Sequence, residues 1–506
     1  MKRMAAFLMA LAAGACLSTT AMAAPQGQMV FARGGWVTTL DPHVETSFVL
    51  TETLPYIFDT LLTKEIGTGK IIPHLAESHQ FVTPTALEMK LRKGVKFSNG
   101  EPVNAEAVKF SIDRIQDPKN KSRQAVYIRS VKSVEVVDEY TVRIHTKDPD
   151  AIIESILAGW VYIAPPKYYS QHAAAYLSRN PVGSGPYTLV SWKRRQEIVL
   201  EAKPDYWKPG VPKIKRAIIK EVPEAATRIA GLLSGAVDIA DRIPPQMVAR
   251  IRANSNLEVV SYPIPRVAYV KIFVKEGPLT DMRVRQALNY AVDKQKIIQS
   301  VLDGYARQVA LLQVPQSFGY HPGIKPYPYD PEKAKKLLAE AGYPKGFEVD
   351  LVIPVGRYHM GERVTEAVSG YLEKVGVRTT VKPVEWGSFV RTLVRRWRPE
   401  VKPFLQFAAR YDTPLDCDWM MEMITARGSY SLYDNPQLNP RIDLARATVD
   451  KAKRLDMYLR LNEELKELAP FIFLHQEMAL YGKKRGVVFP QSYDGQFRFH
   501  AADIGD

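Results

Sequence analysis

The stretch "YDPEKAKKLLAEAGYPKGFEVDLVI" (Tyr329–Ile353) contains, in order, a helix start, a helix end and a strand. Asp330 suits the N-cap, and the proline after it suits the first helical position, where its missing N–H costs nothing. Gly342 stands just past the expected helix end, and Pro344 prevents the helix from continuing. The residues of Phe347–Ile353 then alternate between apolar and polar. The stretch therefore predicts a helix, a short turn and a strand.

The same pattern repeats directly downstream. "GERVTEAVSGYLEKV" (Gly361–Val375) has the apolar spacing of a helix, and "VRTTVKPVEW" (Val377–Trp386) reads as a second strand. A β-α-β unit of this kind indicates a parallel or mixed sheet covered by helices. Upstream, Thr280–Leu302 opens with a Thr-Asp cap and carries a helical apolar stripe. We therefore predict an α/β fold after about residue 275.

The N-terminal half shows a different pattern of predicted strands and helices. Short alternating segments such as "SVKSVEVVDEYTVRIHT" (Ser130–Thr146) are bounded by Gly, Pro, Asn and Asp and read as strands. Helices such as Asn104–Ile115 intervene. This half is predicted to be α+β.

The first residues predict export. "MKRMAAFLMALAAGACLSTTAMAA" has a basic start, an apolar stretch and a small-x-small motif that ends at Ala23. This is the pattern of a secretory signal peptide cut near Ala23, which predicts a periplasmic protein. A lipid anchor at Cys16 is less favoured, because Ala13 stands where such signals usually have leucine. Cleavage would leave Cys417 as the sole cysteine, so no intramolecular disulfide is expected.

The composition describes a basic globular chain. Its 506 residues are 46% hydrophobic and carry a formal net charge of +15. The Lys and Arg residues are spread along the chain, and an exported protein rarely meets nucleic acid, so no nucleic-acid partner is expected. A basic surface that favours anionic ligands is the preferred interpretation.

Several motifs together carry a resemblance. They include "LRKGVKFSNGEPVNAEAVKFSIDRI" (Leu91–Ile115), "NPVGSGPY" (Asn180–Tyr187) and "PLTDMRVRQALNYAVDKQKII" (Pro278–Ile298). In order and without large gaps, the chain from Val37 to Phe499 resembles the periplasmic peptide-binding proteins of ABC importers, the dipeptide, oligopeptide and nickel family. "NPVGSGPY" lacks the Lys-Ser/Thr ending of a phosphate loop and is interpreted as a tight turn at a domain junction.

The resemblance implies a two-lobed periplasmic binding protein fold of type II, in its large three-region form. The hinge strands would cross near Val270–Lys275 and Leu480–Lys484, and ligand would lie between the lobes. It also implies a monomeric binding protein that is not an enzyme, needs no cofactor and delivers its ligand to a membrane ABC permease with ATPase subunits. The implied regions are a signal peptide (1–23), lobe I (24–66, 186–275 and 485–506), an inserted domain II (67–185) and lobe II (276–484).

Arg357 is the first candidate ligand residue. It follows the strand Phe347–Ile353 and precedes a helix start near Gly361, where ligands of open α/β sheets bind. In the resembling dipeptide-binding proteins an Arg in a similar "PV-x-R" pattern binds the peptide carboxylate, as bidentate Arg chemistry allows. Tyr358 and His359 are weaker candidates in the same pocket, and Trp386 is either a pocket wall or a buried structural residue.

The acidic stretch "YDTPLDCDWMMEM" (Tyr411–Met423) has several interpretations. Loop carboxylates two apart give no reason for hydrolysis, a calcium loop would need a glycine, and nearby acids disfavour a reactive Cys417. By resemblance, Asp412 first and Asp416 second would pair with a ligand ammonium group. A solvated acidic loop remains the alternative.

Several ligand classes stay open. A small peptide is preferred, and an opine, glutathione, an oligosaccharide, an organic anion, haem or a chelated metal are alternatives. The nine His residues lack ligand spacing, so no metal held by the protein is expected. An exported hydrolase is a remote alternative, because no G-x-S-x-G or H-E-x-x-H motif occurs.

Overall fold

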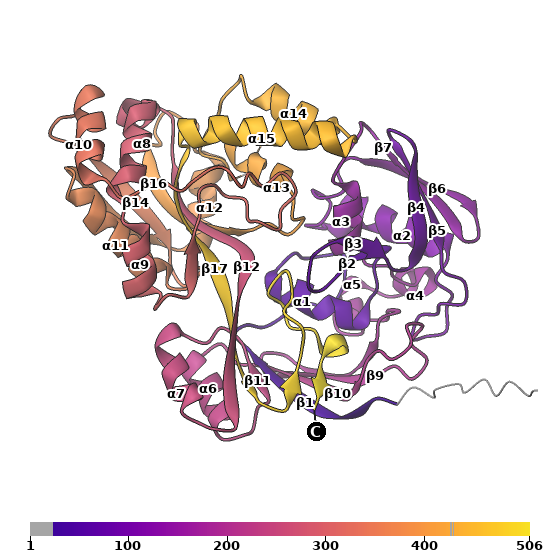
Figure 1. Cartoon of the computed structure of the whole chain (residues 1–506). Coiled ribbons are helices and arrows are strands. Elements are labelled where there is room, and N and C mark those ends of the chain that lie inside the picture. The colour runs from indigo at the N-terminus through magenta and orange to yellow at the C-terminus, as the bar shows by residue number, and fades with distance from the viewer. Residues whose placement is uncertain (1–23, 426–427, 429, 506) are drawn as a thin grey trace, which may run out of the picture.

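The computed structural model describes residues 24–425, 428 and 430–505. An eleven-stranded mixed sheet runs through the molecule, and a separate four-stranded antiparallel sheet forms a small domain at one side (Figure 1). In spatial order the large sheet is β15 (Val377–Val384), β14 (Phe347–Pro354), β16 (Phe404–Tyr411), β12 (Leu257–Ile272), β17 (Phe471–Lys484), β11 (Ile239–Ala240), β1 (Gln26–Arg33), β10 (Ile214–Glu221), β9 (Glu197–Ala202) and β8 (Tyr187–Lys193), with β13 (Ala306–Gln308) paired to β17. The small sheet is β4 (Ala76–Thr83), β5 (Ala86–Leu91), β7 (Thr141–Thr146) and β6 (Val131–Asp138).

Helices cover these sheets, and two short hairpins complete the fold. The helices before the crossing strand β12 are α1 (Phe48–Ile57), α2 (Ala105–Gln116), α3 (Ile153–Gly159), α4 (Pro166–Gln171), α5 (Ala174–Leu177), α6 (Ala225–Leu233) and α7 (Val248–Arg252). Those after it are α8 (Met282–Ala291), α9 (Lys294–Val301), α10 (Pro331–Glu340), α11 (Gly361–Glu373), α12 (Trp386–Val394), α13 (Cys417–Met421), α14 (Asn439–Ala447) and α15 (Lys451–Leu468). The hairpins are β2 (Leu62–Lys64) with β3 (Ile71–Pro73), and β18 (Val487–Val488) with β19 (Asp503–Ile504).

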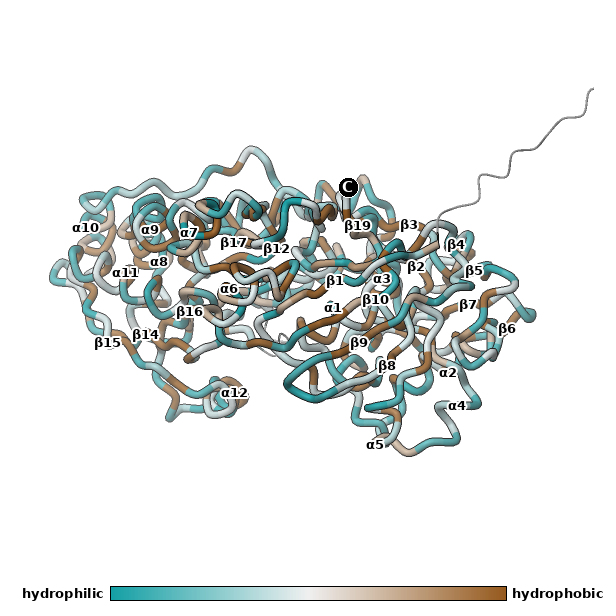
Figure 2. The backbone as a smooth tube through the Cα atoms, turned by 90° about the horizontal axis from the view of Figure 1, so that it is seen from below, coloured by the Kyte–Doolittle hydropathy of each residue, from teal (hydrophilic) through white to brown (hydrophobic). Residues whose placement is uncertain are grey.

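The predicted β-α-β unit is confirmed. The Asp330 side chain accepts the Lys333 N–H (2.9 Å) and caps α10, and Gly342 has the positive φ of +92° expected after a helix end. Strands β14 and β15 pair in parallel, and α11 connects them. Figure 2 shows the hydrophilic character of α10 at the rim of the molecule and hydrophobic residues along the inner strands. Local sequence signals were therefore sufficient to predict this β-α-β unit.

The apolar stripe of Thr280–Leu302 forms two helices, α8 and α9. Val292 between them is extended (φ −101°, ψ 121°), and the Asp293 side chain accepts the Lys296 N–H (2.9 Å) to cap α9. The buried Asn289 bonds the backbone of β17 through both amide atoms, which fixes the end of α8 against that strand. The apolar stripe was predicted correctly, and the break coincides with the Asp293 cap, a local signal that the sequence analysis did not use.

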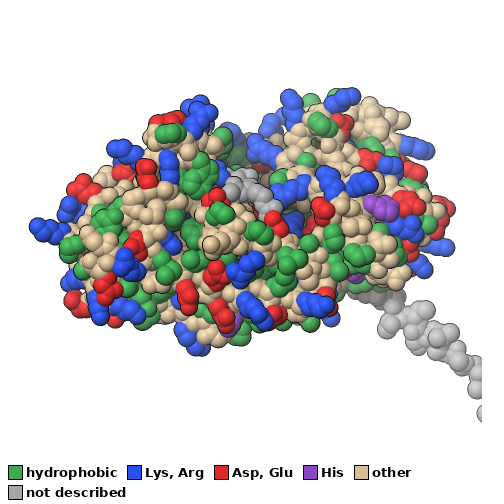
Figure 3. Space-filling model, turned by 90° about the horizontal axis from the view of Figure 1, so that it is seen from above, with side chains coloured by type: hydrophobic (Ala, Val, Ile, Leu, Met, Phe, Trp, Pro, Cys, Tyr) green, Lys and Arg blue, Asp and Glu red, His purple; other side chains and the backbone are tan. Residues whose placement is uncertain are grey.

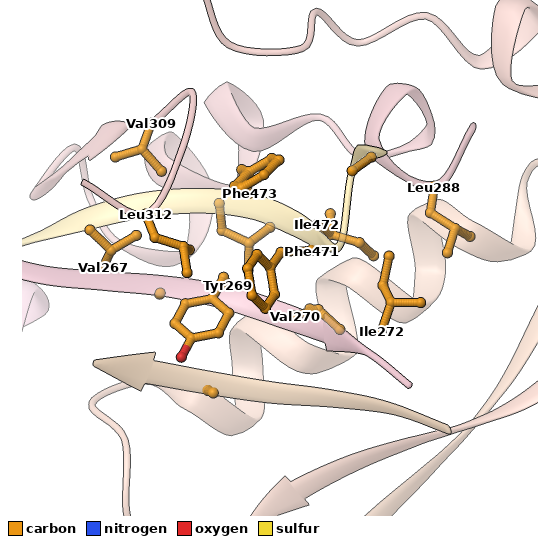
Figure 4. Close-up of a cluster of buried hydrophobic side chains, with 14 of the residues drawn as sticks. Val267, Tyr269, Val270, Ile272, Leu288, Val309, Leu312, Phe471, Ile472 and Phe473 are labelled. Carbon is orange, nitrogen blue, oxygen red and sulfur yellow. The ribbon is translucent and has the colours of Figure 1, made fainter. Parts of the chain in front are cut away.

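Strands β12 and β17 cross from one hydrophobic core to another. In the C-terminal core, residues from Val267 to Ile272 of β12 pack against Phe471–Phe473 of β17 and helix residues such as Leu288 (Figure 4). Tyr262 and Ile264 of the same strand lie in the other core, with β1 and β10. The register shifts between Pro263 and Val267. The crossing therefore lies N-terminal to the predicted Val270–Lys275, and on β17 it lies before the predicted Leu480–Lys484.

Gly183 of the "NPVGSGPY" turn allows this turn to approach the backbone at Ile57 closely. The Gly185 N–H donates to the Ile57 carbonyl (2.9 Å), and a Cβ on Gly183 would lie 2.1 Å from the same oxygen. We expect Gly183→Ala to lower the free energy of unfolding by about 3 kcal/mol, because backbone atoms must move apart. Urea unfolding measures this change.

The control is Gly370→Ala in α11, where an added Cβ meets nothing within 4 Å. This change should stabilise the protein by about 0.5–1 kcal/mol, because alanine favours a helix. Equal stabilities for the two variants would contradict the close approach at Gly183.

Candidate ligand-binding site

A cavity of about 2020 Å³ lies between the two sides of the molecule. Its wall combines loops after β14 and β16 of the C-terminal side with Thr46–Phe48, Arg242 and the C-terminal segment around Asp494. The face seen in Figure 3 is hollowed between its two sides, with Lys and Arg side chains near the hollow. This volume exceeds the roughly 300–1,000 Å³ of most small-molecule sites, so the cavity has room for a ligand larger than a typical small molecule.

The structure brings Arg357 and Trp386 together. The loop after β14 carries Arg357, and its guanidinium carbon lies 3.7 Å from the ring centre of Trp386, the first residue of α12. Trp386 in turn stacks on Tyr430 with ring centres 6.0 Å apart. Arg357 is exposed to the cavity and forms no ion pair with a described acidic residue. Its guanidinium therefore lines the cavity beside the Tyr358 hydroxyl, without a described acidic partner.

Tyr358 and His359 line the same cavity. Tyr358 is buried against Phe407, with ring centres 5.7 Å apart, and burial raises the pKa of its hydroxyl. His359 opens to the cavity, yet the surrounding protein, Arg266 and Arg242 lower the pKa of its ring to about 4. A neutral imidazole at this place can donate or accept a hydrogen bond.

Asp412, the first acidic candidate, is fully buried and has no exposed surface. Its carboxylate accepts the hydroxyl of Ser317 and the Asp416 N–H (3.0 Å), while its own N–H donates to Pro265. Burial raises the pKa of Asp412 to about 7, against the opposing effect of the Ser317 hydrogen bond. Asp412 is not among the described residues that line the cavity.

Asp416 is held by an arginine that is distant in the sequence. Its carboxylate receives two hydrogen bonds, of 2.8 and 2.6 Å, from Arg454 of α15, and it also caps α13 through the Asp418 N–H. The adjacent Cys417 is fully buried, and burial raises the pKa of its thiol well above the ordinary value. Asp416 does not line the cavity either, so ligand contact by Asp412 or Asp416 stays a prediction.

The rest of the acidic stretch contacts the small domain. Arg446 of α14 bonds Asp418 (2.7 Å) and lies 3.6 Å from Asp150, beside α3 of the small domain. Arg129 of the small domain pairs with Glu422 (3.0 Å). Sequence reasoning missed this role, because the arginine partners lie far from the stretch in the sequence.

The cavity lining is more basic than acidic. Several of its acids are held by protein cations, as Asp494 is by Arg498 (2.7 Å) and Glu477 is by Arg266 (3.2 Å). Lys271 also lines the cavity and was missed by the sequence analysis. A lysine inside the apolar run "VAYVKIF" is unusual, and this position is the signal that could have identified it.

Within the described residues, no helix is long and apolar enough to cross a membrane. Over the same part of the chain, His, Cys, Asp and Glu side chains form no group of three that could hold a metal ion. The features present are thus a large two-sided cavity, an open arginine and two crossing strands.

A two-lobed fold with this cavity between its lobes defines a ligand-binding protein. The family described as bacterial extracellular solute-binding proteins, family 5 middle region, matches residues 70–428. The chain belongs to this family, whose members bind solutes outside the cytoplasm for ABC importers. The predicted family and type II fold are confirmed.

Relatives and solved structures agree with this assignment. The chain is 29% identical to the glutathione-binding protein GsiB of Pectobacterium atrosepticum over 485 residues, which cover 94% of each chain. It is also 29% identical to GsiB of Escherichia coli K12, with 97% of each chain covered. Similar structures include Helicobacter pylori DppA in complex with peptide STSA (24% identity, TM-score 0.80, covering 95% of this chain and 98% of that one) and AgaA of A. tumefaciens R10 in complex with agropinic acid (27%, 0.79, 95% and 99%).

Proposed function

We propose that this protein works in the periplasm, where it captures a small peptide or peptide-like solute in its interlobe cavity. It then delivers this solute to a membrane ABC permease. The open guanidinium of Arg357, stacked on Trp386 in a cavity lined by both lobes, is the observation that carries this proposal. The protein acts as a monomer without enzymatic activity. The signal peptide expected to end near Ala23 lies outside the described residues.

Arg357 is the proposed carboxylate-binding residue. An arginine can bind both carboxylate oxygens at once, and the Trp386 ring holds its guanidinium plane in place. Trp386, Tyr358 and His359 would supply the surrounding wall and hydrogen bonds. The names of the relatives, which bind glutathione, and of a similar structure with a bound peptide support a peptide-like ligand.

Lobe closure would complete the site. We propose that lobe I (24–66, 186–275 and 485–506) and lobe II (276–484) rotate about β12 and β17, with the inserted domain II (67–185) moving with lobe I. Closure removes water and strengthens the charged hydrogen bonds. An acidic opine is a second candidate ligand, because the cavity is rich in cations and the 27% identical AgaA structure contains agropinic acid.

Arg357→Ala should weaken binding of the best peptide by 30-fold or more, about 2–5 kcal/mol, because a desolvated carboxylate loses its partner. The ligand comes from a thermal-shift screen of di- and tripeptides, glutathione, opines, sugars and organic acids, and calorimetry measures its affinity. Arg363→Ala is the control, since this exposed arginine of α11 does not line the cavity.

Two outcomes would refute the proposal. If another ligand class raises the melting temperature while no peptide does, the peptide assignment is wrong. If Arg357→Ala and Arg363→Ala bind the peptide equally well, Arg357 does not hold the carboxylate.

A further inference from the structure

Lys271 is a buried cation in the cavity wall. It is 5% exposed, and its ammonium group donates one hydrogen bond, of 2.8 Å, to the carbonyl oxygen of Tyr430. In the described part of the chain no acidic side chain lies within ion-pair distance of it. An ammonium group has three N–H donors, so Lys271 can still donate toward the cavity.

The charged groups around Lys271 are also cations. Arg410 of β16, Arg396 after α12 and Arg357 after β14 all disfavour its charge. Burial first, and then these arginines, lower the pKa of Lys271 to about 7. Such an arrangement is unfavourable in the empty protein, because a buried charge requires a partner.

Neighbouring polar groups are only partly paired within the described residues. Arg410 donates to the sulfur of Met423 (3.2 Å) and lies 3.6 Å from Glu422, while its buried Nε has no hydrogen-bond acceptor among the residues that the structure describes. Gln406 lies directly across the strand ladder from Lys271 and is 1% exposed, and its Oε1 accepts no hydrogen bond from a described residue. Gln406 and Arg410 both line the cavity.

A chain of contacts links these groups to Arg357. The Lys271 ammonium lies 5.9 Å from the ring centre of Tyr430, and this ring stacks on Trp386 beneath Arg357. One ligand in the cavity could therefore contact Arg357 and Lys271 together. We propose that Lys271 and Arg410 form a second anion-binding subsite, so that the ligand is a compound with two acidic groups.

Gln406 adds a further requirement to this subsite. Its carbonyl oxygen, which accepts no hydrogen bond from a described residue, would accept an N–H next to the second acidic group, as an amide of a peptide-like ligand would supply. The inference rests on the proposed function, because it assigns Arg357 the first acidic group. It narrows the ligand from any small peptide to one with an acidic side chain or an additional carboxylate.

The test compares ligands that differ by one acidic group. Calorimetry would use Gly-Glu against Gly-Gln, Gly-Asp against Gly-Asn, glutathione against its monoethyl ester, and the non-peptide pair of glutarate and glutaramate. The acid of at least one pair should bind 30-fold or more tightly than its neutral partner. Lys271→Met should reduce this preference to less than threefold, and Lys271→Arg should retain it.

Two measurements separate binding from folding. Unliganded Lys271→Met should melt at the same temperature as the original protein or higher, because it removes a buried charge among like charges. At pH 8, calorimetry in two buffers should show uptake of up to one proton per acidic ligand, lost in Lys271→Met. The control is Lys382→Met, an exposed lysine of β15 in the same large sheet.

The outcomes distinguish this inference from the proposed function. If peptides bind but each acid binds within threefold of its neutral partner, the second subsite is refuted and peptide capture stands. If Lys271→Met keeps the full preference for acids, the subsite is also refuted. If no peptide binds while glutarate binds with a preference that Lys271→Met loses, the subsite stands and peptide capture is refuted.

Discussion

Replacing Arg454 with methionine is expected to lower the free energy of unfolding by about 3–5 kcal/mol. Arg454 and Asp416 are 3% and 6% exposed, and two hydrogen bonds of 2.8 and 2.6 Å join them. Methionine keeps much of the apolar stem but leaves the Asp416 carboxylate buried without its cation. Urea unfolding followed by circular dichroism measures the loss.

The double variant Arg454→Met with Asp416→Asn should recover much of this stability, because no buried charge is then left unpaired. Arg460→Met is the control on the same helix, since the Arg460 pair with Asp456 (3.1 Å) is largely exposed and contributes little. If Arg454→Met is no more destabilising than Arg460→Met, the ion pair with Asp416 is not part of the folded core.

Replacing Asp412 with asparagine is expected to stabilise the protein by about 2–4 kcal/mol at pH 8. Burial raises the pKa of Asp412 from an ordinary 3.8 to about 7. Between these values the folded protein holds a proton that the unfolded chain releases, so the Asp412 carboxyl contributes less stability as the pH rises. The gain from Asp412→Asn should grow from pH 4 to about pH 7 and then level off.

Thermal unfolding across this pH range checks the prediction, with Asp350→Asn as a control. Asp350 lies on β14 in an exposed pair with Lys382 (2.6 Å), and its replacement should change stability by less than about 1 kcal/mol. An asparagine at 412 can still accept the Asp416 N–H. If Asp412→Asn instead abolishes peptide binding and leaves stability unchanged, Asp412 is a ligand residue.

The fold was predictable where local signals determine it. Asp330, Gly342 and the alternating residues after them were sufficient to place α10 and β14. The break between α8 and α9 was missed, although the Asp293 cap that starts α9 is a local signal. The contact of Asn289 with β17 could not be predicted, because that strand lies far along the chain. The exact crossing of β12 was missed for the same reason, since both cores contribute to it.

The site was predictable in part. The position of Arg357 after a strand placed it at the correct edge of the sheet, where it does line the cavity. The acidic stretch alone did not show whether its carboxylates line the cavity. The partners of Asp416 and Asp418 are Arg454 and Arg446, which lie on later helices. A charge pattern alone does not show which charges the folded protein neutralises internally.

The interrupted ladder between β12 and β17 has a mechanical consequence. Three residues of β12 stand opposite Glu477 of β17 where the backbone pairing stops. Side chains bridge this gap, as Gln476 donates to the Ile264 carbonyl (2.9 Å) and Arg266 pairs with Glu477 (3.2 Å). Side chains can change rotamer while backbone pairing on either side stays intact. We therefore expect rotation of the two halves to take place at this gap, where no backbone pairing between β12 and β17 has to break.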